Sequence, residues 1–252
     1  MASTRAIGRW KTLTYHRLDI SAHLKTSATF YVMTSTQKQS KLPPIPEILP
    51  NPDLTFDPVL HRYRLKGELV PWSVTGITSH NMSQLAREAI EKDKPNWEPR
   101  GRLLHQFVEN LWTGRPLPDV GIYKPWSDAL QAHPIFKTYE AVAVEHRMVS
   151  KDGFFAGSFD ALVRGVSKAG DPLTILIDLK TLKHEHSPTR SCAKQFGAYT
   201  TLLNDAHHVY VDKCVGLFSR PGSVELVVED PQDCIDKWQH CLTEFKKTLP
   251  DW

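Results

Sequence analysis

Cysteine is scarce in this sequence of 252 residues, and none of it is arranged as a compact metal or redox motif. The four cysteines, Cys192, Cys214, Cys234 and Cys241, lie in the C-terminal third, and no two form a C-x-x-C pair. A disulfide framework does not fit this number and placement in a chain of this size. We therefore expect buried thiols and an intracellular, reducing compartment.

Long apolar runs, internal repeats and a strong excess of one charge are also missing. No apolar run approaches membrane-spanning length, so we expect no membrane partner. Hydrophobic residues make up 40% and charged residues 23%, as in ordinary globular proteins that bury a sizeable core. The net charge of +3 is compatible with a polyanionic partner but does not indicate one.

Carboxylates are nearly absent from residues 1–32, where Asp19 is the only one. This basic, Ser/Thr-rich segment has two interpretations: a transit-like leader to an organelle, or a poorly ordered extension with Met33 as an alternative start. The extension is favoured, and it implies a cytoplasmic location in a bacterial or viral setting. Residues 34–52 are predicted to form a proline-rich linker. We therefore predict an extension and linker at 1–52 and a single domain at 53–252.

The most informative stretch predicts a β-hairpin with two carboxylates facing each other. Residues 154–166 and 173–181 are predicted strands, joined by a turn rich in Gly, Ser, Asp and Pro. If the hairpin is symmetric about Ala169, Asp160 lies opposite Asp178, and Ser158 lies opposite Lys180. Residues alternate between the two faces of a strand, so Asp178 and Lys180 share one face.

Two facing carboxylates are unfavourable unless something compensates their charge. A divalent cation held between Asp160 and Asp178 would do so, because hard metals take carboxylate oxygens as ligands. Lys180 on the same face could then stabilise a developing negative charge. The residues therefore predict metal-assisted phosphodiester hydrolysis. The alternative is a surface hairpin in which Asp178 and Lys180 form an ion pair.

Three motifs in this order resemble the PD-(D/E)XK nuclease superfamily, and within it the RecB-like exonucleases. They are Gly-x-x-Asp at 157–160, Asp-x-Lys at 178–180 and Gln-x-x-x-Tyr at 195–199. The resemblance implies a mixed α/β fold, with a restriction-endonuclease-like core and a central mixed sheet flanked by helices. It also implies one or two Mg²⁺ or Mn²⁺ ions. Some relatives hold an iron–sulfur cluster on one upstream and three downstream cysteines; no cysteine precedes Cys192, so we expect no cluster.

The resemblance also assigns the metal ligands. Asp160, Asp178 and the backbone carbonyl of Leu179 match the family's ligand positions. His105 is assigned as a ligand because Gly101 and His105 match a G-x-x-x-H pattern on a helix. Further candidates lie outside these motifs: Glu145, in the first predicted strand, and more weakly Glu109. Helices are predicted at 82–92 and 99–112, separated by a break at 94–99 (KPNWEP), and a third at about 125–140 leads into the strand of Glu145 at 142–150.

The predicted DNA contacts lie on two segments. The helix at about 189–204 carries Gln195 and Tyr199 one turn apart, and Arg190 lies near its start. The segment at 70–75 resembles a V-P-S-V-T stretch of the exonuclease branch, interrupted by Trp72, and contributes Ser73 and Thr75. Either of these two residues is alternatively a helix N-cap.

The expected function is that of a divalent-metal-dependent deoxyribonuclease. It would act as an exonuclease on single-stranded or free DNA ends, in repair, recombination or genome processing, with Asp160, Asp178 and Lys180 as its catalytic residues. Alternatives are a structure-specific or restriction-type endonuclease on the same fold, a DNA-binding module without turnover, and a protein unrelated to nucleic acids. Cleavage polarity, DNA against RNA preference, processivity, oligomeric state and pathway are not predicted.

Overall fold

A computed structural model describes residues 45–250. The predicted leader and most of the predicted linker therefore lie outside the described residues. No helix among the described residues is long and apolar enough to cross a membrane.

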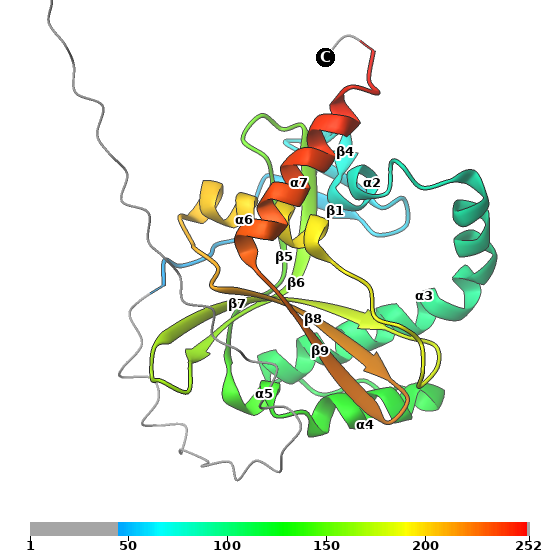
Figure 1. Ribbon diagram of the computed structural model, residues 1–252, viewed down its shortest axis with the longest axis vertical. Coiled ribbons are helices and arrows are strands. Elements are labelled where there is room, and N and C mark those ends of the chain that lie inside the picture. The colour runs from blue at the N-terminus through cyan, green and yellow to red at the C-terminus, as the bar shows by residue number, and fades with distance from the viewer. Residues whose placement is uncertain (1–44, 251–252) are drawn as a thin grey trace, which may run out of the picture. The chain divides into compact units, whose positions relative to one another are not determined.

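A mixed sheet of six strands forms the centre of the domain (Figure 1). The strands are β4 (Trp72–Ser73), β5 (Glu140–Val149), β6 (Phe155–Val166), β7 (Pro172–Thr181), β8 (Lys213–Arg220) and β9 (Ser223–Glu229). Their order is β4-β6-β7-β8-β9, and β5 pairs with β6. The pairs β4/β6 and β7/β8 are parallel and the others antiparallel. This confirms the predicted mixed α/β fold with a central mixed sheet.

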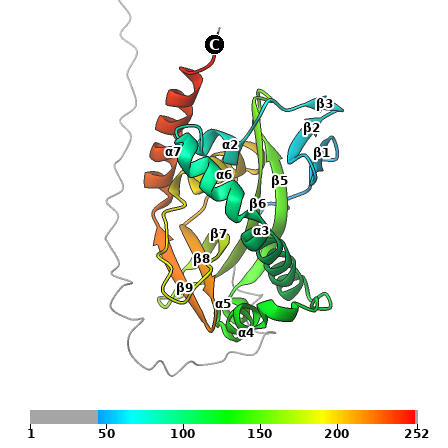
Figure 2. The ribbon, with the colours of Figure 1, turned by 90° about the vertical axis from the view of Figure 1, so that its right-hand side faces the viewer.

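Helices cover both faces of this sheet, as Figures 1 and 2 show. One face packs against α2 (Val74–Thr78), α6 (Ala193–His207) and α7 (Pro231–Lys246), and the other against α3 (Gln84–Thr113) and α4 (Lys124–Ala132). Two short elements, η2 (Gly121–Tyr123) and α5 (Ile135–Thr138), flank α4 in the sequence. The chain order of α3, three strands, α6 and β8 is the predicted one and is compatible with a nuclease-like core.

A small three-stranded sheet precedes the central one. It consists of β1 (Leu54–Asp57), β2 (Arg62–Leu65) and β3 (Glu68–Leu69), all antiparallel. The β2–β3 turn lies at Lys66 and Gly67, and both residues have positive φ angles, of 51° and 85°. Tyr63 and Val70 bury their side chains against Ala156 of β6, which fixes the small sheet to the central one.

The predicted break between two helices is wrong, because α3 is a single helix of 30 residues. Pro95 and Pro99 lie inside it, and each removes one backbone N–H from the helical ladder. The indole of Trp97 donates to the carbonyl of Ile90 at 3.1 Å, which adds a side-chain hydrogen bond to the helix across Pro95. The helix changes direction along its length (Figure 1), as expected where prolines interrupt the ladder.

The β6–β7 hairpin has the predicted register near its turn, where Ala161 pairs with Ile177 and Val166 with Pro172. Beyond Ala161 the two strands no longer pair. One edge of β6 pairs with β5 along most of its length. The other edge pairs with β7 near the turn and with β4 at Phe155 and Ala156. Residues 157–160 of β6 therefore face an opening in the sheet, between β4 and β7.

Candidate metal centre

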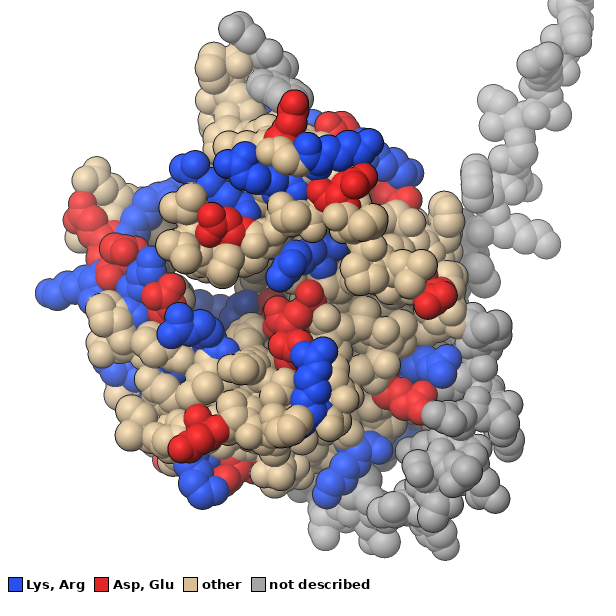
Figure 3. Space-filling view, turned by 180° about the vertical axis from the view of Figure 1, so that it is seen from behind, with Lys and Arg blue, Asp and Glu red and all other residues tan. Residues whose placement is uncertain are grey.

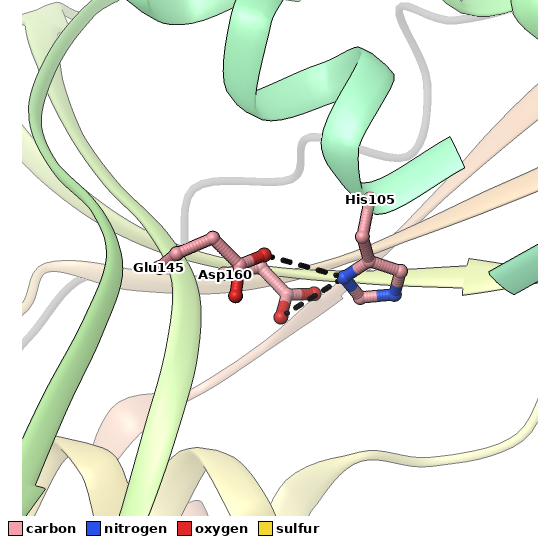
Figure 4. A group of neighbouring side chains, drawn as sticks. All are labelled: His105, Glu145 and Asp160. Carbon is pink, nitrogen blue, oxygen red and sulfur yellow. Dashed lines mark ion pairs between the residues drawn. The ribbon is translucent and has the colours of Figure 1, made fainter. Parts of the chain in front are cut away.

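Three side chains from three different elements meet at this opening: His105 of α3, Glu145 of β5 and Asp160 of β6 (Figure 4). The Nδ1 atom of His105 lies 3.5 Å from Oε1 of Glu145 and 3.4 Å from Oδ1 of Asp160. One potential ligand atom from each residue lies within 4.8 Å of the other two. These three residues could hold a metal ion, and "the metal centre" denotes this candidate site.

Glu145 reaches this position through an irregularity in β5. Its φ angle is 48°, in the left-handed region that non-glycine residues rarely adopt. Val144 pairs with Ala161 and His146 with Phe159, so Glu145 lies opposite Asp160 in the ladder. A strained backbone that persists at one strand position is a common property of functional sites and costs on the order of 1 kcal/mol. Here it accompanies two carboxylates placed side by side.

Asp160 occupies the point where the hairpin opens. Its Oδ2 accepts a hydrogen bond of 2.5 Å from the backbone N–H of Leu179, so a side chain replaces a strand-to-strand backbone bond. Phe159 and Leu162 both belong to the core under α6 and α7, although they are three residues apart. The alternation of side chains between the two faces of the sheet is therefore interrupted at Asp160 and Ala161. This interruption lets Asp160 meet His105 on the opposite layer.

Electrostatics tie the three side chains of the metal centre together. Burial opposes the imidazolium of His105, but the carboxylates of Asp160 and Glu145 outweigh it and raise its pKa to about 10. Burial would raise the pKa of Asp160, yet His105 and Lys180 hold it below its usual value. Burial and the neighbouring Asp160 raise the pKa of Glu145. The protonated imidazole thus supplies the positive charge that two adjacent carboxylates require.

Asp178 lies outside this group of three and pairs with Lys180 instead. Its side chain is buried, and Oδ2 lies 2.5 Å from the Lys180 Nζ atom. Burial raises the pKa of Asp178 despite this ammonium, and the negative charge of Asp160 acts in the same direction. Lys180 keeps its charge: burial opposes it, but Asp178 and Asp160 raise its pKa above the usual value. The predicted faces are confirmed, since Leu176 and Leu179 pack into opposite cores.

The cation predicted between Asp160 and Asp178 stays a prediction, and the two carboxylates have different partners in this structure. Asp160 joins His105 and Glu145, whereas Asp178 joins Lys180. Leu179 lies between them and contacts the centre through its N–H rather than its carbonyl. The roles of Asp178 and of the Leu179 carbonyl as ligands remain predictions.

The predicted DNA contacts are spread over buried and exposed positions. Tyr199 is buried over Gly157, where an added Cβ would come within 2.7 Å of its ring, so stacking of this ring on a base does not fit its burial. Gln195 is half-buried and Arg190 is exposed near the start of α6. The hydroxyl of Ser73 accepts a 3.0 Å hydrogen bond from the N–H of Gly76, which confirms it as the N-cap of α2.

Thr75 is exposed on α2, and its carbonyl accepts hydrogen bonds from Thr78 and Ser79. Glu109 lies one turn beyond His105 on α3 and pairs with Arg115 at 2.9 Å; it is not one of the three clustered residues, although its charge contributes to the raised pKa of Glu145. Neither residue touches the three clustered side chains.

Sequence reasoning missed a buried arginine that connects α3 to β7. Arg100 donates from Nε to the Thr181 hydroxyl at 3.3 Å and from an Nη atom to the Thr181 carbonyl at 3.1 Å. Its guanidinium lies over the ring of Trp126, whose indole donates to the Leu182 carbonyl at 2.7 Å. Arg100 makes no ion pair with a carboxylate in the part of the chain that the structure describes. These bonds hold the helix of His105 against the strand of Asp178 and Lys180.

Two further residues border the site without a sequence signal of their own. The thiol of Cys192 lies beside Asp178; burial, followed by the Asp178 charge, raises its pKa to about 12. Tyr63 of β2 is buried, and burial raises its pKa to about 12, with a smaller contribution from Glu145. Tyr63 lies 82 residues before Glu145 in the sequence, so only the packing of the small sheet brings the two together.

The donor atoms of the metal centre fit a divalent cation. Two carboxylates are hard oxygen ligands, and an imidazole nitrogen suits first-row transition metals. The three side chains could therefore hold a metal ion, and their donor atoms do not select one divalent metal over another. A cation here would replace the proton that His105 carries.

Charged side chains are unevenly spread over one face of the molecule. Figure 3 shows a hollow on one face, with lysine and arginine side chains above it and acidic side chains beside it. A polyanion would be attracted to such a margin and repelled by the acids unless a cation neutralised them.

No family model and no curated protein matches the chain. Among solved structures, the chain is similar to the protein described as SSO0001, at 16% identity, covering 71% of this chain and 76% of that chain, with a TM-score of 0.40. A likeness of this size says nothing about function.

Proposed function

We propose that this protein is a divalent-metal-dependent phosphodiester hydrolase that acts on DNA, with a fold and site of the PD-(D/E)XK type. One observation carries the proposal: His105, Glu145 and Asp160 converge where β6 and β7 separate, next to the Asp178–Lys180 pair. Carboxylates, a histidine and a lysine in one opening of a sheet serve phosphoryl transfer better than they serve stability, because buried like charges are costly.

Each residue has a distinct role in the proposed reaction. His105, Glu145 and Asp160 would hold Mn²⁺ or Mg²⁺, and a bound cation would act as a Lewis acid toward a phosphoryl oxygen. Lys180 keeps its ammonium charged and can stabilise the negative charge that develops on the phosphoryl oxygens. Asp178 holds that ammonium in place.

The proposed substrate is DNA with a single-stranded or free end. Arg190 and Gln195 near the start of α6 offer donors to phosphate oxygens, which give affinity without reading sequence. Affinity that depends on phosphate contacts falls steeply with salt. The preference for free ends rests on the motif resemblance and is the part of the proposal that most needs an experiment.

The test uses three substrates: end-labelled linear single-stranded DNA, end-labelled linear duplex and circular single-stranded DNA. Each is incubated with Mn²⁺, Mg²⁺ or EDTA. We expect metal-dependent loss of the linear strands with the circle spared. Asp160→Asn should lower the rate by at least about 10²-fold, since it removes a charged ligand of the cation that would act as the Lewis acid. The matched control is Glu109→Gln, which removes a nearby carboxylate that pairs with Arg115 instead.

Other outcomes are equally informative. Cleavage of the circle would replace the exonuclease by an endonuclease. Equal rates for the parent and for folded Asp160→Asn would refute the assigned centre. If folded protein binds DNA but cleaves nothing in either metal, the chain is a DNA-binding module.

A further inference from the structure

A pocket near the metal centre lies between the β2–β3 hairpin and the start of α2. Its volume is about 330 Å³, within the range of small-ligand sites. Leu60, Arg62, Tyr63, Leu69, Trp72 and Ser73 are among the residues that line it. None of the sequence motifs assigns a function to the hairpin side of this pocket.

The walls of this pocket combine apolar surface, aromatic rings and a positive charge. Leu60 and Leu69 are 59% and 47% exposed, which leaves two large apolar side chains in contact with water. Trp72 is half-buried, with its inner edge packed against Phe245. Arg62 is exposed, and its guanidinium makes no hydrogen bond or ion pair with any residue between 45 and 250. Two backbone hydrogen bonds lower the pKa of Asp57, the partner of Arg62 in the β1–β2 ladder, and the charge of Arg62 adds a smaller effect in the same direction. A ligand with a flat apolar part and an anionic group would contact the two leucines and Trp72 with its apolar part and pair with Arg62 through its charge.

The pocket is close to the metal centre through the backbone as well as through side chains. Trp72 and Ser73 form β4, which runs parallel to β6 and pairs with Phe155 and Ala156. Asp160 is four residues farther along β6, about 13 Å at the rise of a strand. Tyr63 forms one wall of the pocket, and its phenol also lies near Glu145. A nucleotide chain could therefore reach the pocket and the metal centre together.

We propose that this pocket holds the base and phosphate of a nucleotide neighbouring the scissile phosphodiester. The base would lie against the apolar side chains and Trp72, and a phosphate would pair with Arg62. Because every base has an apolar face, such a contact tolerates any sequence. This inference rests on the proposed function for its biological meaning, but the binding itself does not require turnover.

Calorimetry on the full chain in EDTA separates binding from cleavage. The probes are 5′-dAMP, 3′-dAMP, deoxyadenosine and inorganic phosphate, followed by a single-stranded oligonucleotide. We expect at least one mononucleotide to bind more tightly than both the nucleoside and phosphate. Arg62→Gln should weaken that binding about tenfold, since it removes a charged hydrogen bond. Leu69→Asp should weaken it about tenfold or more by placing a negative charge and a polar group on the apolar wall.

The matched control is Arg64→Gln. Arg64 is exposed on the same strand, but it donates to the carbonyl of Gly67 at 3.0 Å and does not line the pocket. It should bind mononucleotides as the parent does. Both test positions are exposed, and far-ultraviolet circular dichroism will show whether the variants stay folded.

Three outcomes would overturn the inference. Mononucleotides binding no better than phosphate would exclude a base site. Unchanged affinity in both Arg62→Gln and Leu69→Asp would place binding elsewhere. Weaker mononucleotide binding with unchanged oligonucleotide affinity would indicate a site for free nucleotides instead. Asp160→Asn should bind nucleotides like the parent in EDTA. If this variant loses cleavage in the presence of metal but keeps nucleotide binding in EDTA, the result tests the metal centre and does not bear on the pocket.

Discussion

The β6–β7 hairpin is regular at its turn, whereas its other end is held largely by side chains. Near the turn, residues 161–166 pair with residues 172–177 as an antiparallel ladder, with Leu162 and Leu176 buried on one face. At the open end, Asp160 bonds to the Leu179 N–H and Asp178 pairs with Lys180. Both ends belong to the same two strands.

The difference shows how one hairpin serves two purposes. The closed end, residues 161–166 and 172–177 next to the turn, gains stability from backbone hydrogen bonds and apolar burial, which need no particular side-chain chemistry. The open end gives up strand pairing and buries charged groups, whose desolvation is compensated only by each other. We therefore expect substitutions at the closed end to change stability alone, and substitutions at the open end to change function as well.

Leu176→Ala should have the largest effect on stability. Leu176 is fully buried at the closed end, so truncation should lower the free energy of unfolding by about 2–5 kcal/mol through lost burial and a cavity. Mn²⁺ affinity of the folded variant should stay at the parent value. Urea unfolding and Mn²⁺ titration by electron paramagnetic resonance measure the two quantities. A folded Leu176→Ala protein with weakened Mn²⁺ binding would show that the ends are not independent.

Lys180→Met at the open end should lower both the stability of the fold and the rate of cleavage. It leaves Asp178 buried without its ion-pair partner, which costs toward the lower end of about 3–5 kcal/mol because Lys180 is 37% exposed and partly screened by water. The loss should shrink at acidic pH, since Asp178 has a raised pKa and can take up a proton. Cleavage should fall by roughly 10²–10³-fold.

The double variant Asp178→Asn/Lys180→Met separates the two effects. With no buried charge left unpaired, it should regain most of the lost stability but none of the activity. Recovery of cleavage would mean that Lys180 only protects the fold, and failure to regain stability would mean that Asp178 is not the source of the loss.

The closed end follows from the sequence, and the open end follows only in part. Alternating apolar residues and a Gly/Asp/Pro turn predicted both strands and their register correctly. His105, Glu145 and Asp160 were each identified as candidate ligands. Their grouping without Asp178 depends on the positive φ of Glu145 and on the interrupted alternation at Asp160, and neither has a single-sequence signal.

Helix α3 shows why local rules fail where tertiary contacts compensate for them. Two prolines within five residues predict a helix break, yet Arg100 anchors this region to Thr181 and Trp97 bonds to a carbonyl one turn before the prolines. Tyr199 shows the converse case. Its spacing from Gln195 places both residues on one side of the helix as predicted DNA contacts, but Tyr199 is buried against Gly157.

The smallest expected effect is a change in how stability depends on pH when Mn²⁺ is present. Without metal, the pKa of His105 is raised from 6.5 to about 10. Its charge therefore stabilises the fold fully below about pH 6.5, and this contribution is lost as the pH rises toward 10. Metal binding requires the neutral imidazole and releases its proton, so Mn²⁺ affinity should rise up to about tenfold per pH unit in the same window.

Thermal unfolding between pH 6 and 8.5, with and without Mn²⁺, compares the two trends: the stabilisation by Mn²⁺ should grow with pH. In His105→Gln the imidazole proton is gone, so the pH dependence of Mn²⁺ binding should largely disappear. The Leu176→Ala protein from the closed end should keep the parent slope. If the parent itself shows no slope, His105 does not exchange a proton for the metal, and the open end is a charge network rather than a cation site.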